Sequence, residues 1–133
     1  MNDLHRLSAV DAARRIARRE LSAEQYLQAF LDRIEAREPE VRAFAYLGRE
    51  QALAAARALD QGPVRGPLHG LPVGVKDIFD TYDMPTQGGS KVYEGNQGSI
   101  DAACVAMSRH QGAVIIGKTV TTELATLDRK SVV

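Results

Sequence analysis

Residues 66–77 read Gly-Pro-Leu-His-Gly-Leu-Pro-Val-Gly-Val-Lys-Asp, an apolar run that ends in a lysine and an aspartate. Within it, Leu71–Val75 predicts a buried strand. The surrounding segment, residues 62–98, holds eight of the eleven glycines and four of the five prolines. Because apolar residues are interleaved with them, we expect ordered, tightly turning backbone here and not a flexible linker.

A second strand is predicted further along the chain. Ala113–Gly117 is a continuous apolar run, which is typical of a strand covered on both faces in α/β proteins. The residues before it predict a helix that Asp101 caps and that Gly112 ends. The order of helix, glycine and strand indicates one unit of an α/β fold.

The first third of the chain predicts helices. Ser8 pairs with Asp11 as an N-cap, and Ser22 with Gln25 forms a capping box that begins a second helix. The second helix carries one apolar stripe that is wide enough to need a partner surface. The stripe consists of Tyr26, Leu27, Phe30, Leu31 and Ile34.

A proline closes this part of the chain. Pro39 is expected to end the helical region, and residues 41–47 predict a short strand. A third helix is expected over about residues 50–59, before a Gln-Gly-Pro stop. Its inward-facing residues are expected to be Leu53, Ala56 and Leu59.

The composition excludes several classes of function. The 133 residues suit one domain, and Lys plus Arg and Asp plus Glu both number 17, so the formal net charge is zero. A general nucleic-acid or anionic-membrane surface needs excess positive charge. No stretch approaches the roughly 18 apolar residues of a membrane span. We therefore expect neither direct nucleic-acid binding nor membrane insertion.

The metal-binding and redox-active residue types are sparse. Cys104 is the single cysteine, so no disulfide within the chain and no cysteine-based zinc site can form. Its small apolar neighbours predict a buried, inert thiol, and a lone cysteine fits a reducing cytoplasm. His5, His69 and His110 are scattered without the spacing of metal ligands. We expect no metal and no cofactor.

Lys76 is the candidate functional residue. It ends the apolar strand between Val75 and Ile78, where burial would disfavour its charged form and lower its pKa. A lysine with the exposed pKa of about 10.4 is no base at neutral pH, whereas a buried lysine can act as a general base. The local sequence leaves a structural alternative open, in which Lys76 extends to solvent or pairs with Asp77 or Asp80.

Residues 66–77 resemble the block around the catalytic lysine of the amidase signature family. Further blocks resemble the same family at consistent spacing, and together they cover about residues 5–126. Several ordered blocks indicate a family relationship and say little about the substrate. The further blocks are Ser22–Ile34, Glu35–Phe44, Met84–Ser90, Asp101–Val105, Gly112–Thr119 and Thr122–Ala125.

The resemblance implies an α/β fold with a mixed central sheet covered by helices. It also implies a triad of a nucleophilic serine, a bridging serine in a cis peptide and a lysine, with Lys76 as the base. The family has both serines downstream of the matched blocks, so residues 1–127 are expected to be the N-terminal part of an amidase domain, catalytically incomplete alone. Ser90 follows two glycines but lacks the family's Gly-Gly-Ser-Ser-Gly-Gly run, so we interpret it as a turn residue near the pocket.

Residues 128–133 break the family pattern. They read Asp-Arg-Lys-Ser-Val-Val, and we interpret them as a non-native tail on a truncated gene fragment. A natural, disordered basic tail is the alternative. A sheet cut after Ile116 is expected to expose an unpaired edge or an uncovered apolar face, which would make the isolated fragment prone to aggregation.

The resemblance implies an amidase that hydrolyses a small carboxamide to a carboxylate and ammonia. The alternatives are the A chain of a glutamine-dependent tRNA amidotransferase, which would bind partner subunits, and a non-catalytic fragment or binding module. Val120 stands where some members, including those amidotransferase chains, have asparagine, and Leu124 stands where phenylalanine is common. Both differences favour a free-standing amidase, whose expected partners are a small amide substrate and a second copy in a homodimer.

Overall fold

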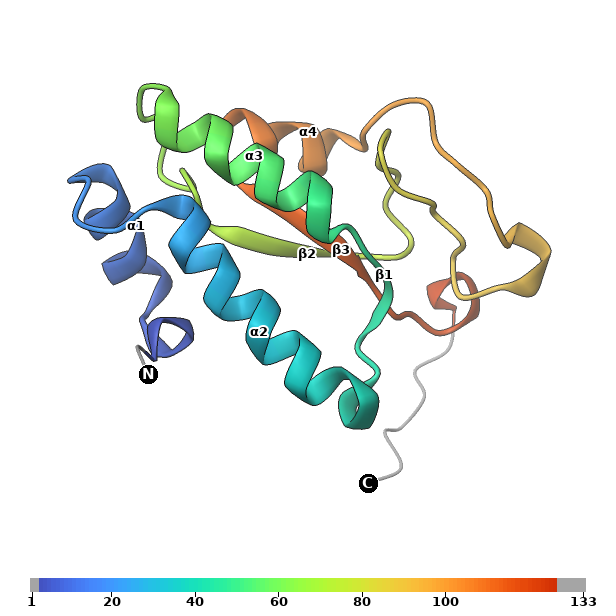
Figure 1. Ribbon diagram of the computed structural model, residues 1–133. Coiled ribbons are helices and arrows are strands. Elements are labelled where there is room, and N and C mark those ends of the chain that lie inside the picture. The colour runs from blue at the N-terminus through green and yellow to red at the C-terminus, as the bar shows by residue number, and fades with distance from the viewer. Residues whose placement is uncertain (1–2, 127–133) are drawn as a thin grey trace.

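A mixed three-stranded sheet lies at the centre of the computed structural model, which describes residues 3–126 (Figure 1). The strands are β1 (Phe44–Leu47), β2 (Pro72–Lys76) and β3 (Val114–Thr119), in the spatial order β1-β3-β2. β1 runs antiparallel to β3, and β2 runs parallel to it. The predicted α/β class with a mixed sheet is confirmed.

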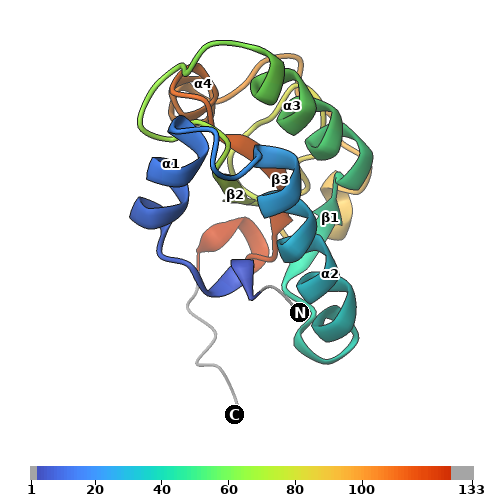
Figure 2. The same cartoon turned by 60° about the vertical axis from the view of Figure 1, so that its left-hand side comes forward.

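Helices cover both faces of this sheet. α1 (Ala9–Ala17), α2 (Ala23–Val41) and α3 (Arg49–Gln61) lie on one face, and α4 (Ala103–His110) lies on the other. Figure 2 shows α2 and α3 along one side of the strands and α4 on the opposite side. Three short 3-10 turns complete the order of elements: η1 (Leu4–Arg6), η2 (Lys91–Tyr93) and η3 (Glu123–Ala125).

The predicted helix starts are confirmed. The Ser8 hydroxyl accepts a hydrogen bond from the backbone N–H of Asp11 at 3.1 Å. Ser22 and Gln25 form a reciprocal capping box, which satisfies two backbone donors that the first turn of α2 leaves free. These local side-chain bonds explain why both helices begin where the sequence predicts.

Two apolar clusters lie on opposite faces of β3. Val114 and Ile116 face α1, α2 and α3, whereas Ala113 and Ile115 face α4 and the segment after β2. Successive side chains of a strand point to opposite faces, so a strand between two helical layers is apolar throughout. The double coverage predicted from the run at 113–117 is therefore confirmed.

Two predicted ends of helices are wrong. Pro39 does not end the helical region, because α2 continues through it to Val41, and the backbone N–H of Arg42 still donates to the carbonyl of Glu38 at 2.9 Å. A proline in the last turn removes only one hydrogen bond of the helix. Asp101 does not cap α4, whose N-cap is Ala102. The Asp101 carboxylate instead accepts a hydrogen bond from the backbone N–H of Tyr82 at 3.0 Å.

The predicted burial of Cys104 is also wrong, because this residue is exposed on α4. Val105 is the buried residue of that short helix, and it faces the sheet. In an eight-residue helix only one narrow stripe reaches the core, so the neighbouring residue points away from it. Small apolar neighbours in the sequence did not indicate which face of the helix Cys104 occupies.

Residues 77–101, here called the loop region, connect β2 to α4 and form the yellow-to-orange lobe beside the sheet in Figure 1. Its order depends on hydrogen bonds between distant residues. The backbone N–H of Thr86 donates to the carbonyl of Asn96 at 2.8 Å, and the Asn96 amide donates back to the Thr86 carbonyl at 2.9 Å. Arg109 of α4 binds Asp83 at 2.7 Å and Asp101 at 3.0 Å. These contacts agree with the prediction that this part of the chain is ordered and is not a flexible linker.

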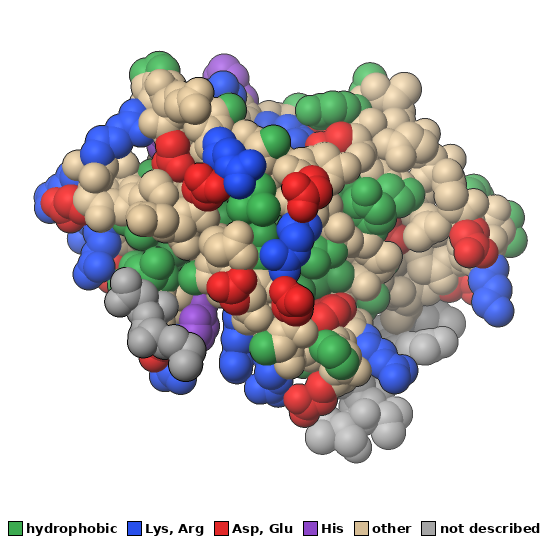
Figure 3. All heavy atoms as spheres, in the orientation of Figure 1, with side chains coloured by type: hydrophobic (Ala, Val, Ile, Leu, Met, Phe, Trp, Pro, Cys, Tyr) green, Lys and Arg blue, Asp and Glu red, His purple; other side chains and the backbone are tan. Residues whose placement is uncertain are grey.

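The sheet has two edges among the described residues. β3 continues past Ile116 to Thr119 and is the central strand, so β1 and β2 form the edges. Figure 3 shows acidic and basic side chains interspersed over the face formed by α2 and α3, which agrees with the zero formal net charge. Between residues 3 and 126 no helix is both long and apolar enough to cross a membrane. The predicted tail at residues 128–133 lies outside the described residues.

Candidate active site

Lys76 lies at the carboxyl end of β2, beside a cavity of about 980 Å³. It is the last residue of the strand and pairs with Thr119 of β3. The cavity is open and its lining comes from three parts of the chain: β2, the loop region and the residues that follow β3. The lining residues are Lys76, Gly89–Val92, Val120–Glu123 and Ala125.

Two loops meet closely at this cavity. Gly89 has a φ of +66°, and a Cβ atom at this position would come within 2.6 Å of the Thr121 carbonyl oxygen. Only glycine adopts this conformation readily and leaves room for such an approach. The backbone N–H of Leu124 also donates to the Gly88 carbonyl at 2.7 Å. The glycine pair thus holds the loop region against the chain that follows β3.

Ser90 is a turn residue beside the cavity, as predicted. Its hydroxyl caps η2 and donates to the Glu123 carboxylate at 2.8 Å. The side chain is 7% exposed. The Ser90–Glu123 bond adds a second tie between the loop region and the residues after β3.

The burial that we expected for Lys76 is found at another lysine. Lys76 is exposed to the open cavity, whereas Lys118 on the neighbouring strand is 0% exposed. Lys76 is the last residue of a strand at the edge of the sheet that residues 3–126 form, and it lines the cavity. Lys118 lies on the central strand, which is covered on both faces. The position of each strand in the sheet thus decides which lysine is buried, and the local sequence does not show that position.

Lys118 is held by three oxygen atoms. Its ammonium donates to the Thr86 hydroxyl at 2.6 Å and to the Pro85 carbonyl at 3.2 Å, and it lies 3.3 Å from the Asp77 carboxylate. Burial lowers the pKa of Lys118, and the negative charge of Asp77 opposes that shift. Since an ammonium has three donors and no acceptor, these three partners use its full hydrogen-bonding capacity.

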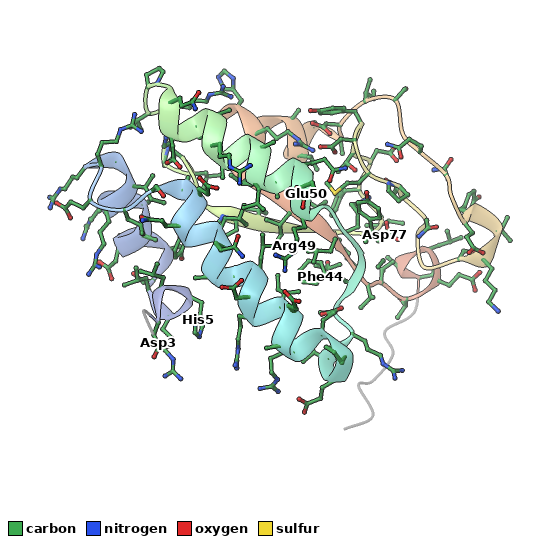
Figure 4. The ribbon with its side chains drawn as sticks, in the orientation of Figure 1. Asp3, His5, Phe44, Arg49, Glu50 and Asp77 are labelled. Atoms are coloured by element: carbon green, nitrogen blue, oxygen red, sulfur yellow. The ribbon has the colours of Figure 1, made fainter. Side chains whose placement is uncertain are left out.

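Asp77 therefore pairs with Lys118 and not with Lys76. The exposed position of Lys76 agrees with the other form of the structural alternative, in which that lysine extends to solvent. Figure 4 shows Asp77 where the sheet meets the loop region. Sequence reasoning missed the role of Lys118 because the predicted strand stopped at Gly117, two residues before the end of β3. The available signal was a lysine that directly continues an apolar run expected to be covered on both faces.

Comparison with known proteins establishes the family. The model of the Amidase family matches residues 25–129, so the chain belongs to this family. The A chain of the glutamyl-tRNA(Gln) amidotransferase of Acidothermus cellulolyticus is 48% identical over 129 residues, which is 94% of this chain and 26% of that protein. The putative amidase AmiD of Mycobacterium bovis is 40% identical and matches over 93% of this chain and 27% of its own length. The chain thus spans about a quarter of the length of these relatives.

Solved structures of amidases share the fold. The native peptide amidase from Stenotrophomonas maltophilia has a TM-score of 0.84 and 34% identity, covering 95% of this chain and 27% of its own. A fatty acid amide hydrolase has a TM-score of 0.84 and 27% identity, covering 89% of this chain and 22% of its own. The predicted relationship to the amidase signature family is confirmed, and the fold is that of the corresponding part of these enzymes.

Between residues 3 and 126, no group of three or more His, Cys, Asp or Glu side chains is arranged to hold a metal ion. The two lysines of the sheet are Lys76, the last residue of β2, and Lys118, the next-to-last residue of β3. One is open to a cavity and the other is enclosed by oxygen atoms, so the two suit different roles.

Proposed function

We propose that this chain belongs to an amidase that hydrolyses a small carboxamide to a carboxylate and ammonia, with Lys76 as the general base. The observation that carries the proposal is the position of Lys76 at the end of β2, exposed to the open cavity, in a chain of the Amidase family. A base must reach the proton that it removes. Lys76 reaches the open cavity, whereas the fully buried Lys118 does not. A fully exposed lysine stays charged at neutral pH, so the proposal requires the part of the amidase outside residues 3–126 to cover Lys76 and favour its neutral amine.

The proposed reaction uses two serines outside residues 3–126. One serine hydroxyl attacks the amide carbonyl, and its proton passes through a bridging serine to the Lys76 amine. The proton then returns to the leaving ammonia, which leaves an acyl-serine. Water adds to this ester with Lys76 again as base, and the carboxylate is released. The chain as given would supply only the base, so we expect the isolated 133-residue chain to be inactive.

The test uses protein expressed from the complete gene and measures ammonia release from simple carboxamides and amidated dipeptides. Lys76→Ala should lower kcat by about 10²–10⁴-fold, the usual contribution of general acid–base catalysis. Lys76→Arg should be equally inactive, because arginine keeps the charge but does not deprotonate in proteins. Wild-type rates in Lys76→Ala, or full activity in Lys76→Arg, would remove Lys76 from this role.

Arg57→Ala is the control for this experiment. Arg57 lies on α3 and forms an ion pair with Glu24 at 2.7 Å, with both side chains exposed. Exposed pairs of this kind contribute little to stability. This variant should keep wild-type turnover, which would show that loss of a remote cation is not sufficient to affect the reaction.

A second proposal is the A chain of a glutamine-dependent tRNA amidotransferase. The observation that favours it is the 48% identity to the amidotransferase chain of Acidothermus cellulolyticus. In that case glutamine would be the amide, and partner subunits would be required. Ammonia release from glutamine that appears only with co-expressed neighbouring gene products would support this proposal over a free-standing amidase. Val120 and Leu124 remain the residues that favour the amidase.

The location and assembly of the protein are part of the same proposal. An exposed Cys104 thiol, the only cysteine in the sequence, is compatible with a reducing cytoplasm. A homodimer is the assembly proposed for the amidase, and a complex with other subunits is the one proposed for the amidotransferase. Light scattering of the purified protein distinguishes a monomer from either assembly.

A further inference from the structure

We propose that the buried cluster of Asp77, Lys118 and Thr86 is a positioning device for Lys76, which fixes the end of β2 relative to the cavity. This inference rests on the proposed function, because it assigns the cluster to the support of the proposed base. None of the three side chains reaches the open cavity, since they are 2%, 0% and 8% exposed, respectively. The cluster therefore acts through Lys76 and not on the substrate.

Asp77 connects the residue after Lys76 to both sides of the site. Its backbone N–H donates to the Thr119 carbonyl at 2.8 Å, which ties it to the end of β3. Its own carbonyl accepts from the N–H of Gly88 at 2.8 Å, and its carboxylate accepts from the N–H of Gln87 at 3.2 Å. Residues 87–88 lead directly into the glycine and serine that line the cavity.

Lys118 completes the device from the central strand. Its ammonium joins the Asp77 carboxylate to Thr86 and Pro85, so one cation links β3, the residue after the proposed base and the loop region. All three of its donors have partners, and a protonated amine has no acceptor. Lys118 is thus suited to cross-link these segments and is not suited to accept a proton.

Stability alone does not account well for such a cluster. A buried ion pair often contributes no more than a well-packed apolar replacement would, because both charges lose their hydration. Apolar contacts are not directional, whereas this cluster determines the position of three backbone segments. A catalytic group displaced by about 1 Å can lose about a hundredfold in rate. Fixed geometry at Lys76 is therefore the gain that we assign to the cluster.

The kinetic test uses protein expressed from the complete gene and compares two substitutions of one residue. Thr86→Val removes the hydroxyl that accepts from Lys118 but keeps the side-chain shape, and Thr86→Ser keeps the hydroxyl. We expect Thr86→Val and Lys118→Met to lower kcat by about 10–100-fold, with KM within about twofold, as misplacement of a catalytic group predicts. Thr86→Ser should retain wild-type kcat. Equal kcat in folded Thr86→Val, Lys118→Met and wild type would overturn the inference.

A second measurement does not need catalysis. Amide hydrogen exchange on protein expressed from the complete gene should show faster exchange at Asp77 and Gly88 in Thr86→Val, because these N–H groups bond across the cluster. The N–H of Val114, bonded to the Leu71 carbonyl at 2.9 Å at the far end of the sheet, should keep its protection. A uniform change at all three amides would indicate general stability and would contradict positioning.

The two proposals fail separately. Full activity in Lys76→Ala would overturn the proposed base, whatever the amides of Asp77 and Gly88 show. An inactive Lys76→Ala together with unchanged kcat in Thr86→Val and Lys118→Met would leave the base in place and overturn the positioning device. If Lys118→Met does not fold, the Thr86→Val and Thr86→Ser pair still decides, because it changes one hydroxyl group.

Discussion

The face of the sheet covered by α1, α2 and α3 and the loop region at residues 77–101 are held together in different ways. The helical face depends on apolar burial, and its fully buried side chains include Ile16, Leu27 and Leu31. The loop region depends on directional polar contacts, such as the Lys118–Thr86 bond between residues 32 positions apart. Apolar packing tolerates exchange among residues of similar volume, whereas each polar contact requires a particular partner.

This difference coincides with the location of the proposed chemistry. The cavity and Lys76 lie where the sheet meets the loop region, and not among the three helices. Burial without direction can hold a helix against a sheet. A site that must present one amine in one direction needs contacts that fix angles as well as distances. The effects of substitutions in the two regions should therefore differ in kind as well as in size.

Breaking the buried ion pair of Asp77 and Lys118 should produce the largest loss of stability. Asp77→Asn leaves the Lys118 ammonium buried without its counter-charge, so we expect the free energy of unfolding to fall by about 3–5 kcal/mol. The double variant Asp77→Leu/Lys118→Met should recover most of that loss, because it removes both charges together. Urea unfolding of the three proteins measures this. A loss of under about 1 kcal/mol in Asp77→Asn would contradict the role given to the pair.

The helical face should respond to loss of volume and not to loss of a partner. Leu27 is 0% exposed on α2, so Leu27→Ala should lower the free energy of unfolding by about 2–5 kcal/mol. Leu27→Met should cost less than about 1.5 kcal/mol, because methionine conserves the volume. Urea unfolding tests both variants. An equal loss of unfolding free energy in Leu27→Met and Leu27→Ala would contradict the view that apolar volume alone holds the helical face.

The smallest expected effect is a pH dependence at His69, which is 2% exposed at the edge of the helical face. Burial lowers the pKa of His69, the cations Arg19 and Arg65 add to the shift, and Asp60 opposes it. The His69 Nδ1 atom also accepts from the Arg65 N–H at 3.2 Å, and protonation would break that bond.

The direction of the pH dependence follows from the lower pKa of His69 in the folded state. Below the ordinary value of about 6.5 the unfolded chain binds the proton more readily, so stability should fall as the pH falls from 7 toward 5. Thermal melts at both pH values measure this fall. His69→Gln should melt with a weaker pH dependence than wild type, and an equal dependence in both proteins would assign it to other groups.

The sequence predicted the helical face better than the loop region, for a physical reason. Helical periodicity and the Ser22–Gln25 box are local patterns, so the prediction of helices at α1, α2 and α3 and of the inward residues of α2 and α3 is confirmed. The Lys118 cluster forms between segments far apart in the chain, and no local pattern marks it. Cys104 and Asp101 were misplaced because a helix as short as α4 gives little periodicity from which to infer its faces.

The candidate site was only partly predictable. Lys76 and the turn at Ser90 were located from the sequence, and both line the cavity. The burial expected for Lys76 was wrong, because the local apolar run is the same for an edge strand and a central strand. Strand order alone separates the exposed Lys76 from the buried Lys118.

Chemical rescue distinguishes Lys76, the proposed base, from Lys118, the buried lysine proposed to support it. Lys76→Ala, in protein from the complete gene, should regain part of its lost amide hydrolysis when methylamine is added, because the open cavity of about 980 Å³ admits a small amine. Lys118→Ala should gain nothing, since that position is closed to solvent. Recovery of Lys118→Ala but not of Lys76→Ala, or a wild-type rate in Lys76→Ala without amine, would contradict the account.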